Sequence, residues 1–409
     1  MPNSRGSFRT GAVLTAVGVL LTLAGCGGTD DAGSATGATL TMYTFSSSPA
    51  EDQTLKKVVD AYHRTGRNKV SLKILPEYDT ALQTALAGGE PPDVFYVNDN
   101  KLPDMAKNGV LEPIGDKIDN PGDIYPSLRR SFTYRGIDYC PAKDFSTLQL
   151  VYNATEFEKA HLEPPATWDE LTAVARKLSK PNRPALSMNP EFYRWGVFLA
   201  QAGAWPTDDK VTKMTMTDPK LKTALEYVTK LHQDGYAATP QQLGVGWGGE
   251  ALGKGKVAMT IEGNWIAGAM KTDFPDVKYA VAELPAGPAG KATMSFSVCY
   301  GVAAASKHKA AAIDLVKYLT SPKQQLAFTK DFPVMPSRQS LADEWLASKP
   351  ELRPFVTGAS YAKKSVFVPG FPTVIDTFDD GIQGLAKGNK TVDEVISSTQ
   401  QAGEDVLNG

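Results

Sequence analysis

The 409-residue chain has few of the residues that build metal and redox sites. It contains 3 cysteines and 4 histidines, and neither an HExxH nor a CxxC motif occurs, so no zinc or thiol-redox centre is predicted. A G-x-S-x-G motif, typical of secreted esterases, is also missing. We therefore expect neither a metal nor an organic cofactor.

An excess of charge of one sign is missing too. The chain has 43 Lys and Arg against 45 Asp and Glu, a formal net charge of −2, and carries no basic tail. This balance gives no electrostatic footprint for nucleic acid, which we do not expect as a partner. With 42% hydrophobic residues, the chain is long enough for two domains with separate cores.

Long apolar runs are limited to one, from Gly11 to Leu23, which follows Arg5 and Arg9. A positive start, a short apolar run and small residues after it are typical of a secretory signal, and the run is too short to predict a spanning helix. The tetrapeptide LAGC, which ends at Cys26, resembles a bacterial lipobox, whose cysteine is lipidated. An ordinary signal peptide with a chance cysteine is the alternative.

These features predict a lipoprotein signal peptide over residues 1–25 and a flexible tether over 26–37. A lipid on Cys26 would anchor the exported protein on the extracellular face of the cell membrane. Cys140 and Cys299 lie in strand-like runs and would face an oxidising compartment. They can pair as a disulfide or remain two separate buried thiols.

The stretch Gly248-x4-Gly253-Lys254 nearly spells a phosphate-binding P-loop. However, Gly255 occupies the position where Ser or Thr must bind Mg²⁺. A P-loop also lies between a strand and a helix, whereas here a loop precedes and the strand-like VAMTI follows. A nucleotide site is therefore not predicted.

Strands and helices alternate along the first hundred residues. In one predicted helix Leu55, Val58, Val59 and Tyr62 repeat with the spacing of a buried face. The βαβαβ rhythm favours a mainly parallel sheet covered by helices. Further predicted elements are strands 38–43, 70–75, 93–97 and 297–306, helices 80–87, 191–202, 219–233, 309–320 and 322–330, and helices opened by the capping boxes Thr167/Glu170 and Thr391/Glu394.

Aromatic side chains gather in loops that follow strands or open helices, where open α/β sheets bind ligands. Trp168 and Trp195 lie in helical patterns and are predicted to be core residues. Trp265 follows the strand and the turn Glu-Gly-Asn, which favours a cleft position. A glycosidase needs two opposed carboxylates, and nothing distinguishes such a pair among 45 acidic residues.

Four motifs in order carry a resemblance over nearly all of the mature chain. They are AGGEPPDVFYVNDNKLPDMAKNGVLEPI (87–114), YNATEFEKAHLEPPATWDEL (152–171), GKGKVAMTIEGNW (253–265) and SVCYGVAAASKHKAAAIDLVKYLTSP (297–322). The chain resembles the bacterial extracellular solute-binding proteins of ABC importers, in particular the carbohydrate-binding family that includes maltose-binding protein.

The resemblance implies an α/β fold of the two-lobed, periplasmic-binding-protein-like type (class II), with a ligand cleft between the lobes. It places lobe one at 38–143 and 300–340, and lobe two at 144–299 and 341–409. Cys140 and Cys299 then fall on the segments that cross between the lobes, which favours a disulfide. A bridge at this place could restrict hinge motion.

By the same resemblance, Trp265 is the platform on which a sugar ring stacks. Asn264 and Glu262 flank it, although Glu262 can also point into the strand packing. Asp144 resembles the P-x-x-D position of the family. The other residues expected to bind ligand follow strand ends or add aromatic surface: Asn98, Asp99, Asn100, Phe45, Ser46, Phe192 and Trp247. The chain departs from the family at Tyr43, often tryptophan, and at Met294-Ser295-Phe296, often a glycine pair.

The function implied is that of a monomeric receptor, not an enzyme, which captures a mono- or oligosaccharide and delivers it to the membrane subunits of an ABC importer. Two alternatives stay open: a binding protein for a non-sugar solute such as a polyamine or a phosphodiester, and a secreted enzyme that acts on glycosides.

Overall fold

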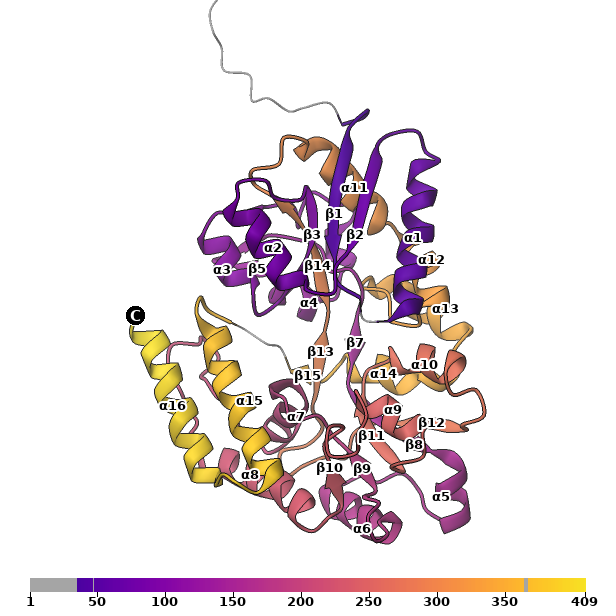
Figure 1. The fold of residues 1–409 in the computed structure, drawn as a ribbon, viewed down its shortest axis with the longest axis vertical. Helices are drawn as coiled ribbons and strands as arrows, with labels where there is room; N and C mark the ends of the chain where they lie inside the picture. The colour runs from indigo at the N-terminus through magenta and orange to yellow at the C-terminus, as the bar shows by residue number, and fades with distance from the viewer. Residues whose placement is uncertain (1–34, 47, 364–366) are drawn as a thin grey trace, which may run out of the picture. The chain divides into compact units, whose positions relative to one another are not determined.

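The computed structural model describes residues 35–46, 48–363 and 367–409. The predicted signal peptide, Cys26 and the tether up to residue 34 lie outside the described residues. From Thr39 onward the chain folds into two sheets covered by helices (Figure 1).

The first sheet has the strand order β2-β1-β3-β14-β4. β1 pairs in parallel with β2 and β3, as the βαβαβ rhythm predicts, and β14 joins antiparallel to β3. The strands of this sheet are β1 (Thr39–Thr44), β2 (Lys69–Ile74), β3 (Val94–Asn98), β4 (Leu111–Glu112) and β14 (Val298–Ala303). The same part of the molecule contains the hairpin of β5 (Thr133–Tyr134) and β6 (Ile137–Asp138). Its helices are α1 (Pro49–His63), α2 (Tyr78–Ala87), α3 (Leu102–Lys107), η1 (Pro121–Asp123), α4 (Pro126–Ser131), α11 (Lys309–Leu319) and α12 (Pro322–Asp331). We call this assembly lobe one.

The second sheet has the order β10-β9-β11-β8-β12 and forms the centre of lobe two. Its strands are β8 (Gln149–Asn153), β9 (Leu186–Ser187), β10 (Ala237–Ala238), β11 (Met259–Glu262) and β12 (Tyr279–Ala282). The helices of lobe two are α5 (Ala154–Ala160), α6 (Trp168–Leu178), α7 (Phe192–Gln201), α8 (Pro219–Gln233), α9 (Gly248–Gly253), α10 (Ile266–Thr272), α15 (Phe371–Lys387) and α16 (Val392–Asn408). α15 and α16 pack side by side and both contact α8 (Figure 1).

The remaining elements connect the two lobes. β7 (Ser146–Thr147), β13 (Thr293–Phe296) and β15 (Ala362–Lys363) form a small sheet, in which β7 and β13 run antiparallel. Residues 339–358 fold as η2 (Gln339–Leu341), α13 (Ala342–Ala347), η3 (Pro350–Leu352) and α14 (Arg353–Gly358). Trp345 and Phe355 of this segment belong to a core cluster that runs from the first sheet into lobe two.

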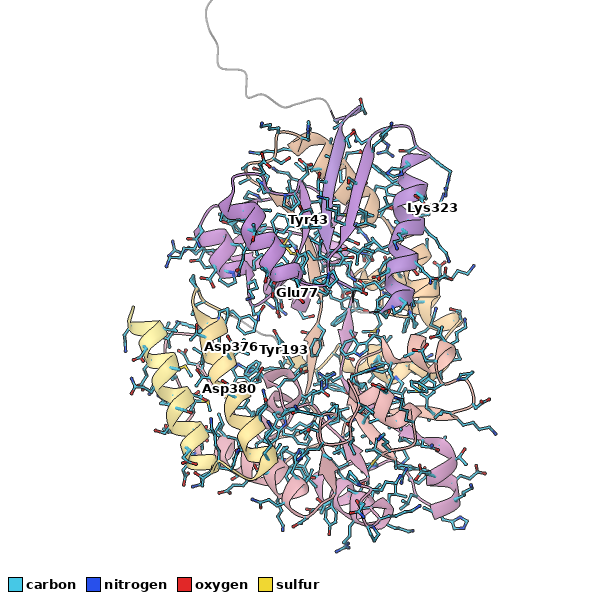
Figure 2. All side chains as sticks on the ribbon, in the orientation of Figure 1. Tyr43, Glu77, Tyr193, Lys323, Asp376 and Asp380 are labelled. Carbon is cyan, nitrogen blue, oxygen red and sulfur yellow. A yellow bond between two sulfur atoms is a disulfide. The ribbon has the colours of Figure 1, made fainter. Side chains whose placement is uncertain are left out.

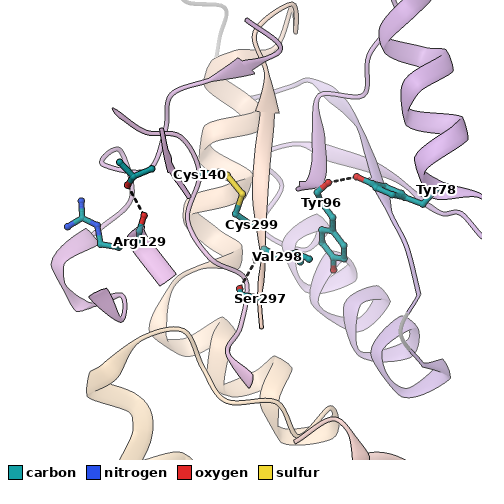
Figure 3. Close-up of a disulfide and its surroundings, with 8 residues drawn as sticks. Tyr78, Tyr96, Arg129, Cys140, Ser297, Val298 and Cys299 are labelled. Carbon is teal, nitrogen blue, oxygen red and sulfur yellow. Dashed lines mark hydrogen bonds between the residues drawn. A yellow bond between two sulfur atoms is a disulfide. The ribbon is translucent and has the colours of Figure 1, made fainter. Parts of the chain in front are cut away.

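Cys140 and Cys299 form a disulfide with their Cα atoms 5.6 Å apart (Figure 3). Both cysteines are at most 1% exposed. Cys299 pairs with Val97 of β3 within the first sheet, so the bridge lies at the lobe-one end of the crossing segments. It ties these two segments together before they run on into lobe two.

Most of the local sequence patterns form the helices and caps that they predict. The predicted helix face of Leu55, Val58, Val59 and Tyr62 is buried in α1. Thr391 and Glu394 form the predicted capping box, but the one at Thr167 is only half made. There the carboxylate of Glu170 accepts from the N–H of Ala166, because residues 166–168 also pair with Ala286. The near-P-loop stretch forms α9 followed by a turn.

A half-buried histidine packs against the core of lobe two. The ring of His232 on α8 stacks on the indole of Trp195, with centroids 5.8 Å apart and planes at 20°. Neither ring nitrogen has a hydrogen-bond partner. Burial therefore disfavours the charged imidazolium and lowers the pKa of His232 to about 4.

This histidine should make the protein less stable in mild acid. In the unfolded chain its pKa is about 6.5, so between pH 6.5 and 4 only the unfolded state takes up the proton. The contribution to the free energy of unfolding is fully present above pH 6.5 and should fall by about 2 kcal/mol at pH 5. Between pH 8 and pH 5, urea unfolding should show that His232→Phe changes the pH dependence of stability by about 2 kcal/mol relative to the native protein, whereas His308→Gln on the surface keeps the native pH dependence. An unchanged pH dependence in His232→Phe would contradict the assignment.

Candidate functional site

A cavity of about 450 Å³ opens between the two lobes and is the candidate site. Lobe one, the crossing segments and lobe two each supply part of its wall, so its shape depends on how the lobes approach each other. The lining residues are Phe45, Ser48, Glu51, Asn98, Phe332 and Val334 from lobe one, Lys143, Asp144, Ser146, Phe296, Ser297 and Val298 from the crossing segments, and Arg194, Trp247, Glu262, Trp265 and Ala269 from lobe two.

Trp265 reaches the cavity because β11 ends at Glu262 and α10 begins at Ile266, which leaves a three-residue connection that ends at Trp265. Its Nε1–H donates to Oε2 of Glu262 at 3.0 Å, and its ring lies edge to face with Phe296 at 5.4 Å. Gly263 lies directly against this indole, since a Cβ there would come within 2.2 Å of the ring. Gly249 lies in the same way against the indole of Trp247. These glycines make room for two cavity tryptophans.

A buried ion pair holds Glu262 at the Nε1 edge of the indole. Nη2 of Arg194 donates to Oε2 of Glu262 at 2.7 Å, and its Nε donates to the carbonyl of Ile261 at 3.1 Å. The Arg194 side chain also pairs with Glu191 at the start of α7. Glu262 is 0% exposed and Arg194 6%. One carboxylate oxygen thus accepts from both the guanidinium and the indole, which fixes the orientation of Trp265.

A second charged cluster lies where the chain crosses out of lobe one. The ammonium of Lys143 pairs with Asp144 at 2.7 Å and also with Glu51 of α1. It lies 5.1 Å from the centroid of Tyr96 and 5.0 Å from that of Phe328. Burial alone lowers the pKa of Lys143, but the carboxylates of Asp144 and Glu51 outweigh this and raise it. Lys143 is therefore a permanent cation in the cavity wall.

Six of the eleven residues predicted to bind ligand line the cavity: Phe45, Asn98, Asp144, Trp247, Glu262 and Trp265. The other five do not. Phe192 is 3% exposed and packs among the aromatic rings of Trp205 and Phe378. Asn264 is fully buried, with its backbone N–H on Ser146 Oγ and its amide on the carbonyl of Phe145.

The remaining three predicted residues lie outside the cavity wall. Ser46 is exposed after β1. Oδ1 of Asp99 accepts from the hydroxyl of Tyr193 at 2.9 Å and from the N–H of Asn100 at 2.8 Å. Burial raises the pKa of Asp99 to about 6, although both donors oppose this shift. Asp99 thus contacts lobe two instead of the cavity.

Several cavity residues were not predicted from the sequence. Arg194 lies in an apolar helix pattern, which predicts core packing, and Phe296 stands out only as a departure from the family. Lys143 could have been found, because it directly precedes Asp144 in an otherwise apolar crossing. A lysine beside a carboxylate that is predicted to bind ligand indicates a second charged residue in the cavity wall.

The family model of the bacterial extracellular solute-binding protein matches residues 57–354 of this chain. The chain belongs to this family. Its members are binding proteins by description, and the two-lobed α/β fold of this binding protein agrees with that. Among the described residues no helix is long and apolar enough to cross a membrane, and within the same residues no cluster of side chains could hold a metal ion.

Relatives and solved structures are similar to this binding protein over most of their length. The diacetylchitobiose-binding protein DasA of Streptomyces coelicolor is 26% identical, covering 81% of this chain and 82% of its own. A solute-binding protein of Thermotoga lettingae, solved with α-D-tagatose bound, is 25% identical with a TM-score of 0.82 over 91% of this chain and 100% of its own. The GacH receptor of Streptomyces glaucescens, solved unliganded and with acarbose, has a TM-score of 0.81 at 24% identity over 91% of this chain and 98% of its own.

Proposed function

We propose that this chain is a carbohydrate receptor of an ABC importer. The observation that carries the proposal is the cavity between the lobes, which presents the indole of Trp265 beside a fixed carboxylate. A flat indole suits the apolar face of a pyranose ring, and carboxylates accept strong hydrogen bonds from hydroxyl groups. DasA, similar over four fifths of the chain, is named for a disaccharide, which supports the same ligand class.

In this proposal the sugar is held from both sides. Trp265 and Trp247 of lobe two offer the aromatic surface, and Asn98 and Phe45 approach from lobe one. Asp144 lies in the crossing wall beside Lys143. A ligand that contacts both walls binds the closed arrangement better than the open one, and this difference drives closure. The boundaries proposed for the moving lobes are those read from the sequence, at residues 143/144, 299/300 and 340/341.

The location and partners belong to the proposal as well. We infer a lipid on Cys26, supported by the LAGC motif, which would anchor the receptor on the extracellular face of the membrane. In this proposal the receptor is a monomer. The closed, loaded protein would then meet the permease subunits of the importer. No step of this cycle makes or breaks a covalent bond in the sugar.

A titration panel tests the ligand class. Purified protein should be titrated by calorimetry with chitobiose, maltooligosaccharides, tagatose and glucose, and in parallel with putrescine and a glycerophosphodiester. At least one neutral sugar should bind at one site and be recovered chemically unchanged. Binding of a charged solute alone would contradict the sugar assignment, and release of a hydrolysed glycoside would indicate an enzyme.

A further inference from the structure

The segment from the end of β3 into α3 joins the cavity to the contacts between the lobes. Asn98 lines the cavity, and the next residue, Asp99, accepts from the hydroxyl of Tyr193 in lobe two. One turn further on, Asp104 of α3 accepts from the backbone N–H of Gly370, with its two oxygens at 3.1 and 3.2 Å. In the view of Figure 2, Tyr193 and Asp376 of α15 lie along the edge of lobe two nearest to Glu77 of lobe one.

Gly370 is the N-cap of α15, a helix of 17 residues. The helix begins without a cap of its own, because Gly370 has no side chain and no acidic residue lies in the first turn. Pro372, in the same turn, has no N–H to offer. The positive end of the helix dipole therefore lacks a local anion, and the carboxylate of Asp104 takes that place from the other lobe.

Each of the other described helices of 15 residues or more has a side-chain cap from the residue directly before it. α1 is capped by Ser48, α8 by Asp218 and α16 by Thr391, each from the residue directly before the helix. A cap of this kind persists whatever the lobes do. The cap of α15 persists only while α3 and α15 stay together, so its free energy depends on the arrangement of the lobes.

Asp104 lies in the first turn of α3, and its carboxylate reaches out of that helix to lobe two. Its carboxylate oxygens bond Gly370, and its side chain is half-buried. α3 starts at Leu102 only four residues after Asn98, so the cavity residue Asn98 and the capping residue Asp104 lie on one short segment of lobe one. We expect a ligand that contacts Asn98 to favour the same arrangement of the lobes that the cap favours.

We propose that Asp104 is a positioning residue that stabilises the arrangement of the lobes described here, in which both lobes line one cavity, by capping α15 from the other lobe, and so raises the affinity for ligand without touching it. This inference rests on the proposed binding function. It predicts one signature that a ligand contact would not give: losing the cap weakens the binding of every ligand by the same factor, because only the closing equilibrium changes.

The test compares Asp104→Ala and Asp104→Asn with Asp79→Ala, an exposed first-turn aspartate of α2 in the same lobe. In the full chain without ligand, Asp104→Ala should enlarge the radius of gyration measured by X-ray scattering. Hydrogen exchange of the amides in the first turn of α15 should speed up. Asp104→Asn, which keeps an acceptor and loses the charge, should lie between Asp104→Ala and the native protein, and Asp79→Ala should match the native protein.

With sugars that bind in the titration panel, Asp104→Ala should weaken each by the same factor, about three- to tenfold. An effect on one sugar alone would show direct contact and overturn the proposal. Native-like scattering and native-like exchange in both Asp104 variants would overturn it as well. Scattering and exchange need no ligand, so they decide this inference even if no sugar binds and the proposed function fails.

Discussion

Replacing Trp265 by alanine should weaken sugar binding by about 100-fold or more, a size typical of a buried aromatic anchor at a binding surface. The change removes the stacking surface and leaves a hollow where the indole filled the wall next to Phe296. It also removes one of the two donors that hold Oε2 of Glu262, so the carboxylate is free to turn. Calorimetric titration with the sugar that binds best to the native protein measures the loss.

A matched pair of milder changes separates stacking from general damage to lobe two. Trp265→Phe keeps an aromatic face and should lose about tenfold in affinity, since a smaller ring covers less of the sugar. Trp205→Phe makes the same change on a tryptophan that packs against Phe192 and does not line the cavity, so affinity should stay native. Equal losses in the two variants, or native affinity in Trp265→Ala, would contradict the role given to Trp265.

Replacing Arg194 by methionine should lower the free energy of unfolding by about 3–5 kcal/mol, because it leaves a buried carboxylate without its cation. Glu262 is 0% exposed, and within the described part of the chain Arg194 is the one cation that pairs with it. The carbonyl of Ile261 loses its donor at the same time. Guanidinium unfolding followed by the circular dichroism of the helices measures the change.

Two companion variants make this result specific. Glu262→Gln in the Arg194→Met background removes the unpaired charge, retains an acceptor for the indole, and should recover most of the lost stability. Glu191→Gln removes the partner of Arg194 whose side chain is 34% exposed, and it should cost less than about 1 kcal/mol. If the double variant were as unstable as Arg194→Met alone, lost packing would explain the effect and the ion pair would not.

Local patterns predict most of the fold because they reflect interactions between residues close in sequence. The buried face of α1 and the cap of α16 need only neighbours within one turn. The turn Glu-Gly-Asn-Trp is of the same kind, since a strand that ends and a helix that begins leave Trp265 at the edge of the sheet. The individual elements and the place of Trp265 in the cavity wall could therefore be predicted, whereas the two-lobed arrangement was implied only by the resemblance of four motifs to a known family.

The direction of a side chain after a strand end is set by partners far away in sequence. Local sequence patterns do not contain this information. Asn264 was expected in the cleft, yet Ser146 and Phe145, more than 115 positions earlier, hold it in the interior. Asp99 follows a strand as Asn98 does, but Tyr193 draws it toward lobe two. Arg194 meets Glu262 across 68 positions, which no helical period indicates.

The disulfide between Cys140 and Cys299 encloses 158 intervening residues, given the sequence separation of 159, and these include all five strands of the second sheet. A protease that cuts the chain once anywhere within this stretch therefore produces two pieces that stay covalently joined. The bridge itself is buried and out of reach of small thiols in the folded protein. An exported protein that is nicked in this half keeps both walls of its cavity on one molecule.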